Sequence, residues 1–122
     1  DIWIPAARPD VLNDENVHQL STRMVLPGAN IPATPGAEAW MHEHGVLYIP
    51  DFIANAGGVI CASVEYHGGT ELQAFEIIEE SIRRNVRDVL CYAMDEDLST
   101  VEAARIIARR RVKEAMGYRV HP

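Results

Sequence analysis

Three short apolar runs, each closed by a proline, constrain the fold of this chain more than any other feature. They occupy residues 1–4, 23–26 and 46–49 and end at Pro5, Pro27 and Pro50. Each run is too short for a helix and favours strand residues, among them β-branched and aromatic side chains. A segment with helical signals separates each run from the next, the pattern of parallel strands joined by crossover helices. The sequence therefore predicts an α/β fold with a three-stranded parallel sheet and flanking helices.

Capping residues place the helices. Asn13 is suited to cap a short helix between the first two strands, and Thr34 with Pro35 is suited to open the next, which Gly45 ends. After Thr70 an apolar residue recurs every three or four positions as far as Ala93, which predicts a long amphipathic helix closed by residues 95–97. Residues 99–102 form a capping box that opens a last helix running to Met116.

The apolar stripes of the last two helices are interpreted as core contacts. They consist of Phe75, Ile78, Ile82, Val86, Val89 and Ala93 in the first, and Val101, Ala104, Ile107, Ala108, Val112 and Ala115 in the second. We expect residues 1–69 to form the sheet-containing unit and residues 70–122 to pack on it as a helical segment, giving a single compact unit.

Composition excludes several classes of partner. Apolar residues make up 48% of the 122 positions, which suits one globular domain, and the formal net charge of −7 opposes binding to nucleic acid. The dense basic run at residues 109–111 spreads around a helix, so we interpret it as a solvated face with ion-pair partners. No apolar run is long enough to cross a membrane. Cys61 and Cys91 form no C-x-x-C pair, which fits reduced thiols and a cytoplasmic location.

The sequence shows no pattern typical of a metal site or of a catalytic nucleophile. His42 and His44 are two positions apart on a helix and face different directions, so we expect a solvated helix end there rather than a metal pair. No Ser-His-Asp arrangement can be argued from spacing, and we assign no catalytic residue to this chain.

Small residues follow each predicted strand. Ala6 and Ala7 follow the first, and Gly28 and Ala29 follow the second. In an open parallel sheet the ligand crevice lies beyond the carboxyl ends of the strands. Small side chains let a flat ligand approach the backbone there.

Two asparagines stand among these small residues, Asn30 after the second strand and Asn55 after the third. A carboxamide donates and accepts hydrogen bonds without carrying charge. It can therefore hold a nicotinamide amide or a ribose hydroxyl without opposing the positive charge of an oxidised ring. The alternative interpretation is that each asparagine is an ordinary turn residue.

The segments around these asparagines resemble a known enzyme family. Residues 27–38, PGANIPATPGAE, and 50–66, PDFIANAGGVICASVEY, resemble the Gly-Ala-Asn and Asn-Ala-Gly-Gly segments of the glutamate/leucine/phenylalanine/valine dehydrogenase family, and residues 4–7, IPAA, resemble its Ile-Pro-Ala-Ala strand exit. The resemblance covers residues 1–66 and is greatest to the glutamate-type members. It implies the second half of a Rossmann-like NAD(P)-binding domain.

The resemblance also implies a reaction, the NAD(P)-dependent oxidative deamination of an amino acid. It assigns cofactor binding to Ala6, Ala7, Gly28, Ala29, Asn30 and Asn55, and substrate binding to Asn55 and Ala62. Glutamate enzymes of the family usually carry a serine where this chain has Ala62. Apolar-substrate members carry an aliphatic residue there, so the amino-acid substrate stays open, as does the choice between NAD and NADP.

Parts of the family's machinery are not found in this sequence. It contains no G-x-G-x-x-G, and its single lysine, Lys113, lies in the last predicted helix. We therefore expect this chain alone to be inactive. Two hypotheses follow: it is part of a full amino-acid dehydrogenase, or it is a free-standing non-catalytic paralogue acting in binding, assembly or regulation.

The edge of the first predicted strand indicates how the chain could associate with a partner. In the doubly wound order it would pair with the missing half of the cofactor domain. Left bare, an apolar edge strand tends to pair with another chain. We expect the partner to be that missing half with the catalytic domain, or a second copy in a homo-oligomer that associates through this edge or through the long helix.

Overall fold

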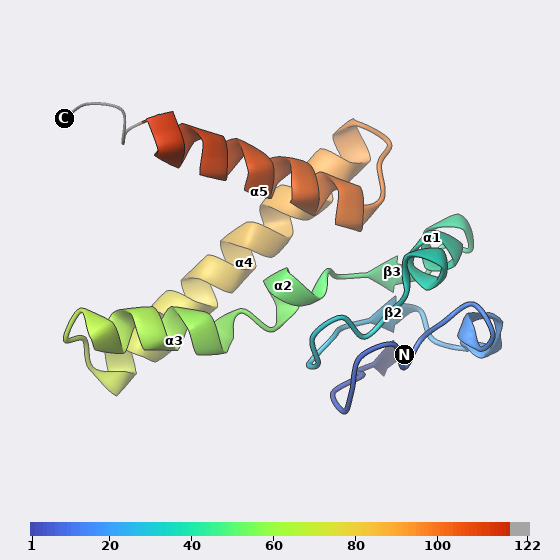
Figure 1. Cartoon of the computed structure of the whole chain (residues 1–122), viewed down its shortest axis with the longest axis horizontal. Helices are drawn as coiled ribbons and strands as arrows, with labels where there is room; N and C mark the ends of the chain where they lie inside the picture. The colour runs from blue at the N-terminus through green and yellow to red at the C-terminus, as the bar shows by residue number, and fades with distance from the viewer. Residues whose placement is uncertain (118–122) are drawn as a thin grey trace.

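A three-stranded parallel sheet forms one end of the protein, in a computed structural model that describes residues 1–117 (Figure 1). The strands are β1 (Ile2–Trp3), β2 (Met24–Val25) and β3 (Leu47–Tyr48), in the order β1-β2-β3. Trp3 is in register with Val25, and Val25 with Tyr48. The predicted α/β class and parallel pairing are confirmed. The strands are shorter than the apolar runs that predicted them.

The connection from β1 to β2 differs from the prediction. Instead of a helix capped by Asn13, it contains a single 3-10 turn, η1 (Val17–Gln19). The Asn13 side-chain oxygen accepts a hydrogen bond from the Glu15 backbone N–H at 3.0 Å. Asparagine side chains compete in this way with helical hydrogen bonding, so the segment forms turns before η1 begins.

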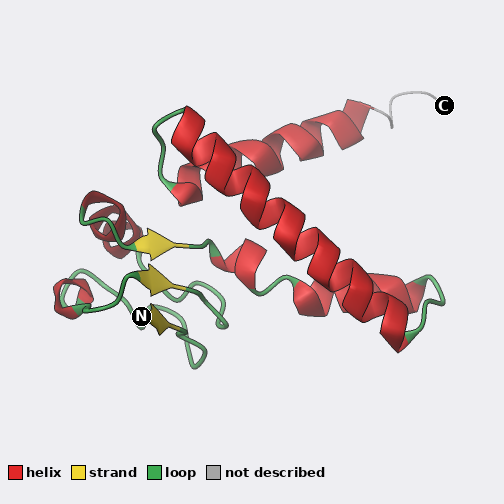
Figure 2. Ribbon diagram, turned by 180° about the vertical axis from the view of Figure 1, so that it is seen from behind, coloured by secondary structure: helices red, strands yellow, loops and turns green. Residues whose placement is uncertain are grey.

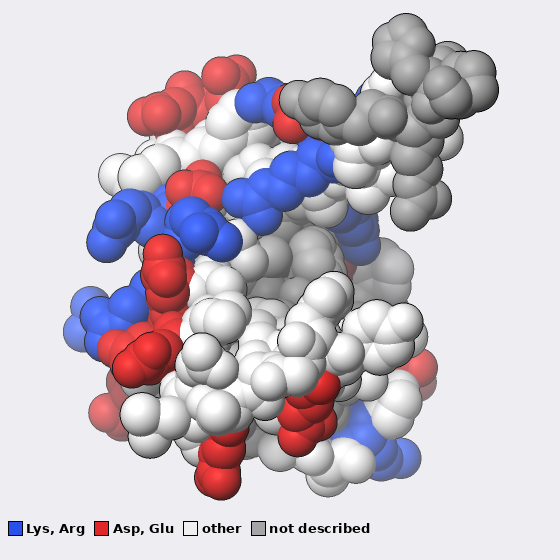
Figure 3. Space-filling model, turned by 90° about the vertical axis from the view of Figure 1, so that its left-hand side faces the viewer, with Lys and Arg blue, Asp and Glu red and all other residues white. Residues whose placement is uncertain are grey.

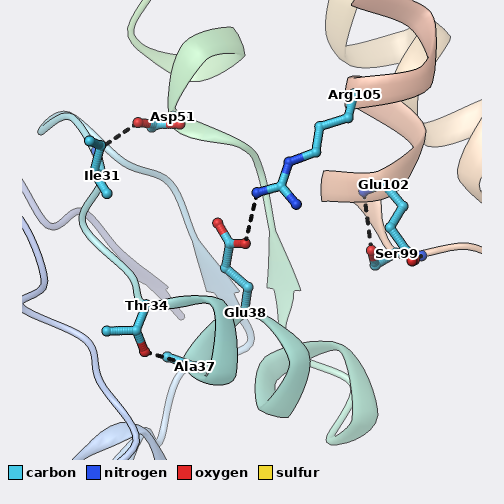
Figure 4. Close-up of polar contacts among 8 residues, drawn as sticks. All are labelled: Ile31, Thr34, Ala37, Glu38, Asp51, Ser99, Glu102 and Arg105. Carbon is cyan, nitrogen blue, oxygen red and sulfur yellow. Dashed lines mark hydrogen bonds and ion pairs between the residues drawn. The ribbon is translucent and has the colours of Figure 1, made fainter.

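Helix α1 (Pro35–Glu43) connects β2 to β3 as predicted. The Thr34 hydroxyl accepts a hydrogen bond from the Ala37 backbone N–H at 3.3 Å, as an N-cap residue does (Figure 4). The helix stops before Gly45, which has a φ of +70°, a conformation that glycine adopts without steric cost.

The core beneath the sheet draws on distant parts of the chain. Its buried members are Leu12, Val17, Val25, Ala33, Ala37, Met41, Tyr48 and Val101. Val101 comes from the last helix, α5 (Thr100–Gly117). At the same point the Thr100 hydroxyl donates a hydrogen bond to the Tyr48 carbonyl. The start of α5 is therefore attached to β3.

Within residues 1–117, four helices follow β3. They are α2 (Asp51–Ala54), α3 (Gly57–Tyr66), α4 (Glu71–Asp95) and α5. The strands point toward α2, and the long helix α4 packs against both α3 and α5 (Figure 2). Val89 and Ala93 of α4 form a second core with Ala103 and Ala104 of α5.

The predicted core stripes are only partly buried. Val89, Ala93, Val101 and Ala104 are buried as expected, but the Phe75 side chain is 63% exposed and that of Val112 is 58% exposed. The physical reason is that α5 crosses α4 near the C-terminal end of α4, and the far end of α5 extends away from the other described elements (Figure 1). For these parts of the helices the interpretation as core contacts is wrong within residues 1–117.

β1 lies at an edge of the sheet, as expected. Its neighbourhood is apolar and exposed, with Ile2 60% and Ile4 58% accessible to solvent. In residues 1–117 no other strand pairs with the outer side of β1.

Charges are mixed on the surface that Figure 3 presents. Arg111 of the basic run lies 2.9 Å from the Asp88 carboxylate, and the Arg110 guanidinium lies over the Tyr92 ring, 5.6 Å from its centroid. The predicted solvated face with an ion-pair partner is confirmed for Arg111. None of the helices in the described part is both long and apolar enough to span a bilayer.

The capping box at the start of α5 gives a testable prediction. The Ser99 hydroxyl accepts from the Glu102 N–H at 3.2 Å, and the Glu102 carboxylate accepts from the Ser99 hydroxyl at 2.9 Å and from its N–H at 3.2 Å (Figure 4). These hydrogen bonds, with that of the Ser99 side chain first, lower the pKa of Glu102. We expect Ser99→Ala to reduce the free energy of unfolding by about 1 kcal/mol at pH 7.

Ser99→Ala should reduce the free energy of unfolding by a smaller amount at acidic pH. A carboxylate whose pKa is lower in the folded state stabilises the fold above its unfolded pKa of 4.5, and this contribution is lost as the pH falls through the folded value. Urea unfolding at pH 7 and pH 3 measures the difference, with the exposed Ser63→Ala as the matched control. An equal loss at both pH values would contradict this account.

Candidate functional site at the carboxyl ends of the strands

The exits of β1 and β2 are tied together by backbone hydrogen bonds. The Pro5 carbonyl accepts from the N–H groups of both Gly28 and Ala29, each at 3.0 Å. Both exits therefore lie at the same edge of the sheet, as a parallel arrangement requires.

Gly28 is needed for this close approach. A Cβ atom at position 28 would lie 3.0 Å from the Cβ of Ala6, which is tighter than ordinary packing. The pairing of a glycine with an alanine lets the two chains meet. Ala6, Ala7 and Gly28 all remain exposed, so the backbone here is open to a ligand.

Asn55 joins the exit of β3 to that of β2. It follows directly after α2, and its side-chain nitrogen donates to the Ala29 carbonyl at 3.2 Å and to the Asn30 side-chain oxygen at 2.8 Å. The two asparagines that the sequence singled out are thus in direct contact.

The remaining polar atoms of this pair face no partner within residues 1–117. The Asn55 side-chain oxygen and the Asn30 side-chain nitrogen make no hydrogen bond to the described residues. Together they offer one acceptor oxygen and two N–H donors. This set complements a carboxamide, which presents the same kinds of group.

Asp51 is a site residue that sequence reasoning missed. Its carboxylate accepts a hydrogen bond from the Ile31 backbone N–H at 2.7 Å, directly after Asn30 (Figure 4). Asp51 and Ile31 are 20 positions apart, and no local sequence pattern predicts their contact. The proline before Asp51 indicates only that a strand ends there.

An ion pair joins α1 to α5. Glu38 of α1 lies 3.6 Å from the Arg105 guanidinium of α5 (Figure 4). Burial raises the pKa of Glu38, the nearby charge of Arg105 opposes the shift, and that of Asp51 adds to it. Burial likewise raises the pKa of Tyr48, so its hydroxyl stays protonated across the physiological range. We assign Glu38, Arg105 and Tyr48 a structural role.

Ala62, the predicted substrate residue, lies exposed on α3. No described contact joins it to the asparagines. The adjacent Ser63 is also exposed. The hydrogen bonds of the described residues thus join Asn30 and Asn55, and the role of Ala62 stays a prediction.

His42 and His44 lie at the C-terminal end of α1. His44 stacks on Trp40 with ring centroids 3.9 Å apart, and its Nδ1 lies 2.9 Å from the Trp40 carbonyl oxygen. Its position at the C-terminal end of α1 is the one expected. Among residues 1–117 no three His, Cys, Asp or Glu side chains gather as a metal site would require.

A hollow of about 540 Å³ lies elsewhere, next to the start of β3 and the turn between α4 and α5. Leu47, Leu90 and Met94 contribute to its apolar lining. It includes neither Asn30 nor Asn55, so it is separate from the strand exits.

Comparison with known sequences identifies relatives of the chain. The profile of the family described as Glutamate/Leucine/Phenylalanine/Valine dehydrogenase matches residues 1–119. The chain is 37% identical to a glutamate dehydrogenase of Aeropyrum pernix, covering 98% of this chain and 31% of that protein. It is 34% identical to an NADP(+)-dependent glutamate dehydrogenase of Pyrobaculum calidifontis, covering 95% of this chain and 29% of that protein.

Solved structures of amino-acid dehydrogenases share the fold of this chain. An L-tryptophan dehydrogenase from Nostoc punctiforme superposes with a TM-score of 0.86 at 28% identity, covering 93% of this chain and 35% of that one. A hetero-hexameric glutamate dehydrogenase from Thermus thermophilus gives a TM-score of 0.83 at 26% identity, covering 99% of this chain and 31% of that one.

Fold and comparisons together identify the class of protein. The three-stranded parallel sheet with its helices is a Rossmann-like half-domain of the kind found in amino-acid dehydrogenases. The chain belongs to the glutamate/leucine/phenylalanine/valine dehydrogenase family. It spans about a third of the length of the curated relatives it matches. The resemblance seen in the sequence is confirmed.

The asparagine pair gives a prediction that separates donor from acceptor. Asn55→Asp replaces a donor that faces two oxygens with a charged acceptor, and we expect it to reduce the free energy of unfolding by about 1–3 kcal/mol. Asn30→Asp keeps an acceptor oxygen facing Asn55 and should cost less. Urea unfolding of the two variants measures the difference. An Asn30→Asp loss as large as that of Asn55→Asp would contradict the geometry.

Proposed function

We propose that the protein takes part in the NAD(P)-dependent oxidative deamination of an amino acid, with the strand exits holding the nicotinamide end of the cofactor. The observation that carries this proposal is the 2.8 Å contact between the Asn55 side-chain nitrogen and the Asn30 side-chain oxygen. It places a neutral pair of carboxamides at the carboxyl ends of parallel strands, where ligands of such sheets bind. Family membership supplies the reaction class.

In the proposed hydride transfer, this part of the protein would contribute the positions of cofactor and substrate and not reactive side chains. A bound oxidised nicotinamide would accept the hydride that leaves the α-carbon of the amino acid, and water would then convert the imine into a 2-oxo acid and ammonia. In this proposal Ala6, Ala7, Gly28 and Ala29 admit the cofactor to the backbone, while Asn30 and Asn55 orient its carboxamide. Fixed orientation of donor and acceptor is the main contribution of the protein in such reactions.

The substrate is proposed only as an amino acid. Ala62 cannot donate a hydrogen bond to a side-chain carboxylate, whereas the neighbouring Ser63 carries a hydroxyl on the same exposed stretch of α3. Relatives named for glutamate and for L-tryptophan both resemble the chain. Comparison of glutamate with apolar amino acids, each with NAD and with NADP, would decide the substrate and the cofactor. A cytoplasmic location stays a prediction.

A matched pair of variants tests the proposed site. In the intact protein we expect Asn55→Ala to raise the dissociation constant of the nicotinamide cofactor about tenfold or more, because the orienting carboxamide is lost. Asn85→Ala is the control, since it removes an asparagine that bonds Arg111 far along α4. Calorimetric titration with each reduced cofactor measures both. Absence of binding in the wild type would overturn the proposed function and favour a non-catalytic role in binding, assembly or regulation.

Assembly gives a second prediction. We propose that the protein self-associates, because the edge of β1 exposes Ile2 and Ile4, and one relative is a hetero-hexamer. An apolar strand edge without a partner favours pairing with another chain. Ile2→Lys should lower the sedimentation coefficient if β1 forms the contact, whereas Phe75→Lys should do so if α4 forms it. A wild type that sediments as a monomer would contradict self-association.

A further inference from the structure

We propose that Asp51 is a positioning residue for the nicotinamide site: its carboxylate holds Ile31 in a left-handed backbone conformation and so fixes the direction of Asn30. This inference rests on the proposed function for its consequence in binding. Its structural part rests on contacts of the described residues alone.

The backbone at Ile31 is unusual. Its φ is +50°, which β-branched residues rarely adopt because the side chain meets its own backbone. Pro32 follows, and a residue before proline favours extended conformations instead. The Ile31 side chain is 64% exposed, so burial of that side chain does not explain the conformation.

Two hydrogen bonds hold the Ile31 backbone from opposite sides. Its N–H donates to the Asp51 carboxylate at 2.7 Å, and its carbonyl accepts from the Asp10 N–H at 2.9 Å. The bond to Asp51 has a charged acceptor, and such bonds are stronger than neutral ones. It is also the one that a side-chain substitution can remove.

Hydrogen bonds from the two ends of α2 therefore attach it to the loop that follows β2. Asp51 is the first residue of α2 and Asn55 follows its last residue, so the two are four positions apart, about one helical turn. Asp51 binds the N–H of Ile31, and Asn55 binds the Ala29 carbonyl and the Asn30 side chain. Asn30 lies between these attachments. Without Asp51 only the Asn55 attachment would remain between α2 and this loop, and the carboxamide of Asn30 would lose its fixed direction.

Removal of the carboxylate and relief of the strain test this inference together. In the intact protein we expect Asp51→Ala to weaken binding of the reduced cofactor about tenfold, with the KM for the amino acid nearly unchanged. Adding Ile31→Gly should recover most of the lost affinity, because glycine adopts a positive φ without a side-chain clash. Asp51→Asn keeps an acceptor oxygen and should fall between wild type and Asp51→Ala.

The outcomes separate this inference from the proposed function. Unchanged cofactor affinity in Asp51→Ala, or a loss that Ile31→Gly does not recover, would overturn the role of Asp51 while the proposed function stands. A wild type that binds neither cofactor would overturn the proposed function and, with it, the binding role of Asp51.

Amide hydrogen exchange at Ile31 tests the structural part in every case. Protection that falls in Asp51→Ala supports it, and protection that stays at the wild-type level overturns it. If Asp51→Ala does not fold, Asp51→Asn is compared with and without Ile31→Gly, and the same two criteria apply.

Discussion

The bond from the Asn55 side chain to the loop after β2 is the interaction on which the site depends. It joins positions 25 residues apart and brings together two exits that the sequence separates by a whole crossover helix. The parallel sheet makes this possible, because parallel strands end at one edge. The Asn55 nitrogen donates to the Ala29 carbonyl and to the Asn30 oxygen, and in the proposed site the Asn55 oxygen would accept a hydrogen bond from the cofactor.

The backbone around this bond is arranged for close approach. A Cβ atom at position 28 would lie closer to Ala6 than ordinary packing allows, and Ile31 adopts a conformation that its own side chain disfavours. Proteins keep such local conflicts where the surroundings hold them, and they concentrate at functional sites. Here the surroundings are Asp10 and Asp51, which bond the Ile31 backbone on either side.

The helices beyond the sheet show where periodicity is insufficient. An apolar stripe predicts a face that packs against something, but it does not state which element covers which part of it. Val89 and Ala93 meet α5 and are buried, whereas Phe75 lies on the same helix and is exposed in the described part of the chain. The distinction follows from where α4 and α5 cross, which depends on the turn between them and on the attachment of Thr100 to Tyr48.

The sequence by itself determined the class of fold and the capped starts of α1 and α5, because prolines and capping residues act through local geometry. Only the tertiary structure decided that the side chains of Asn30 and Asn55 meet and that Asp51 bonds the backbone of Ile31. These depend on contacts between segments far apart in the chain. Local preference cannot specify such contacts, since they arise only when the sheet has formed.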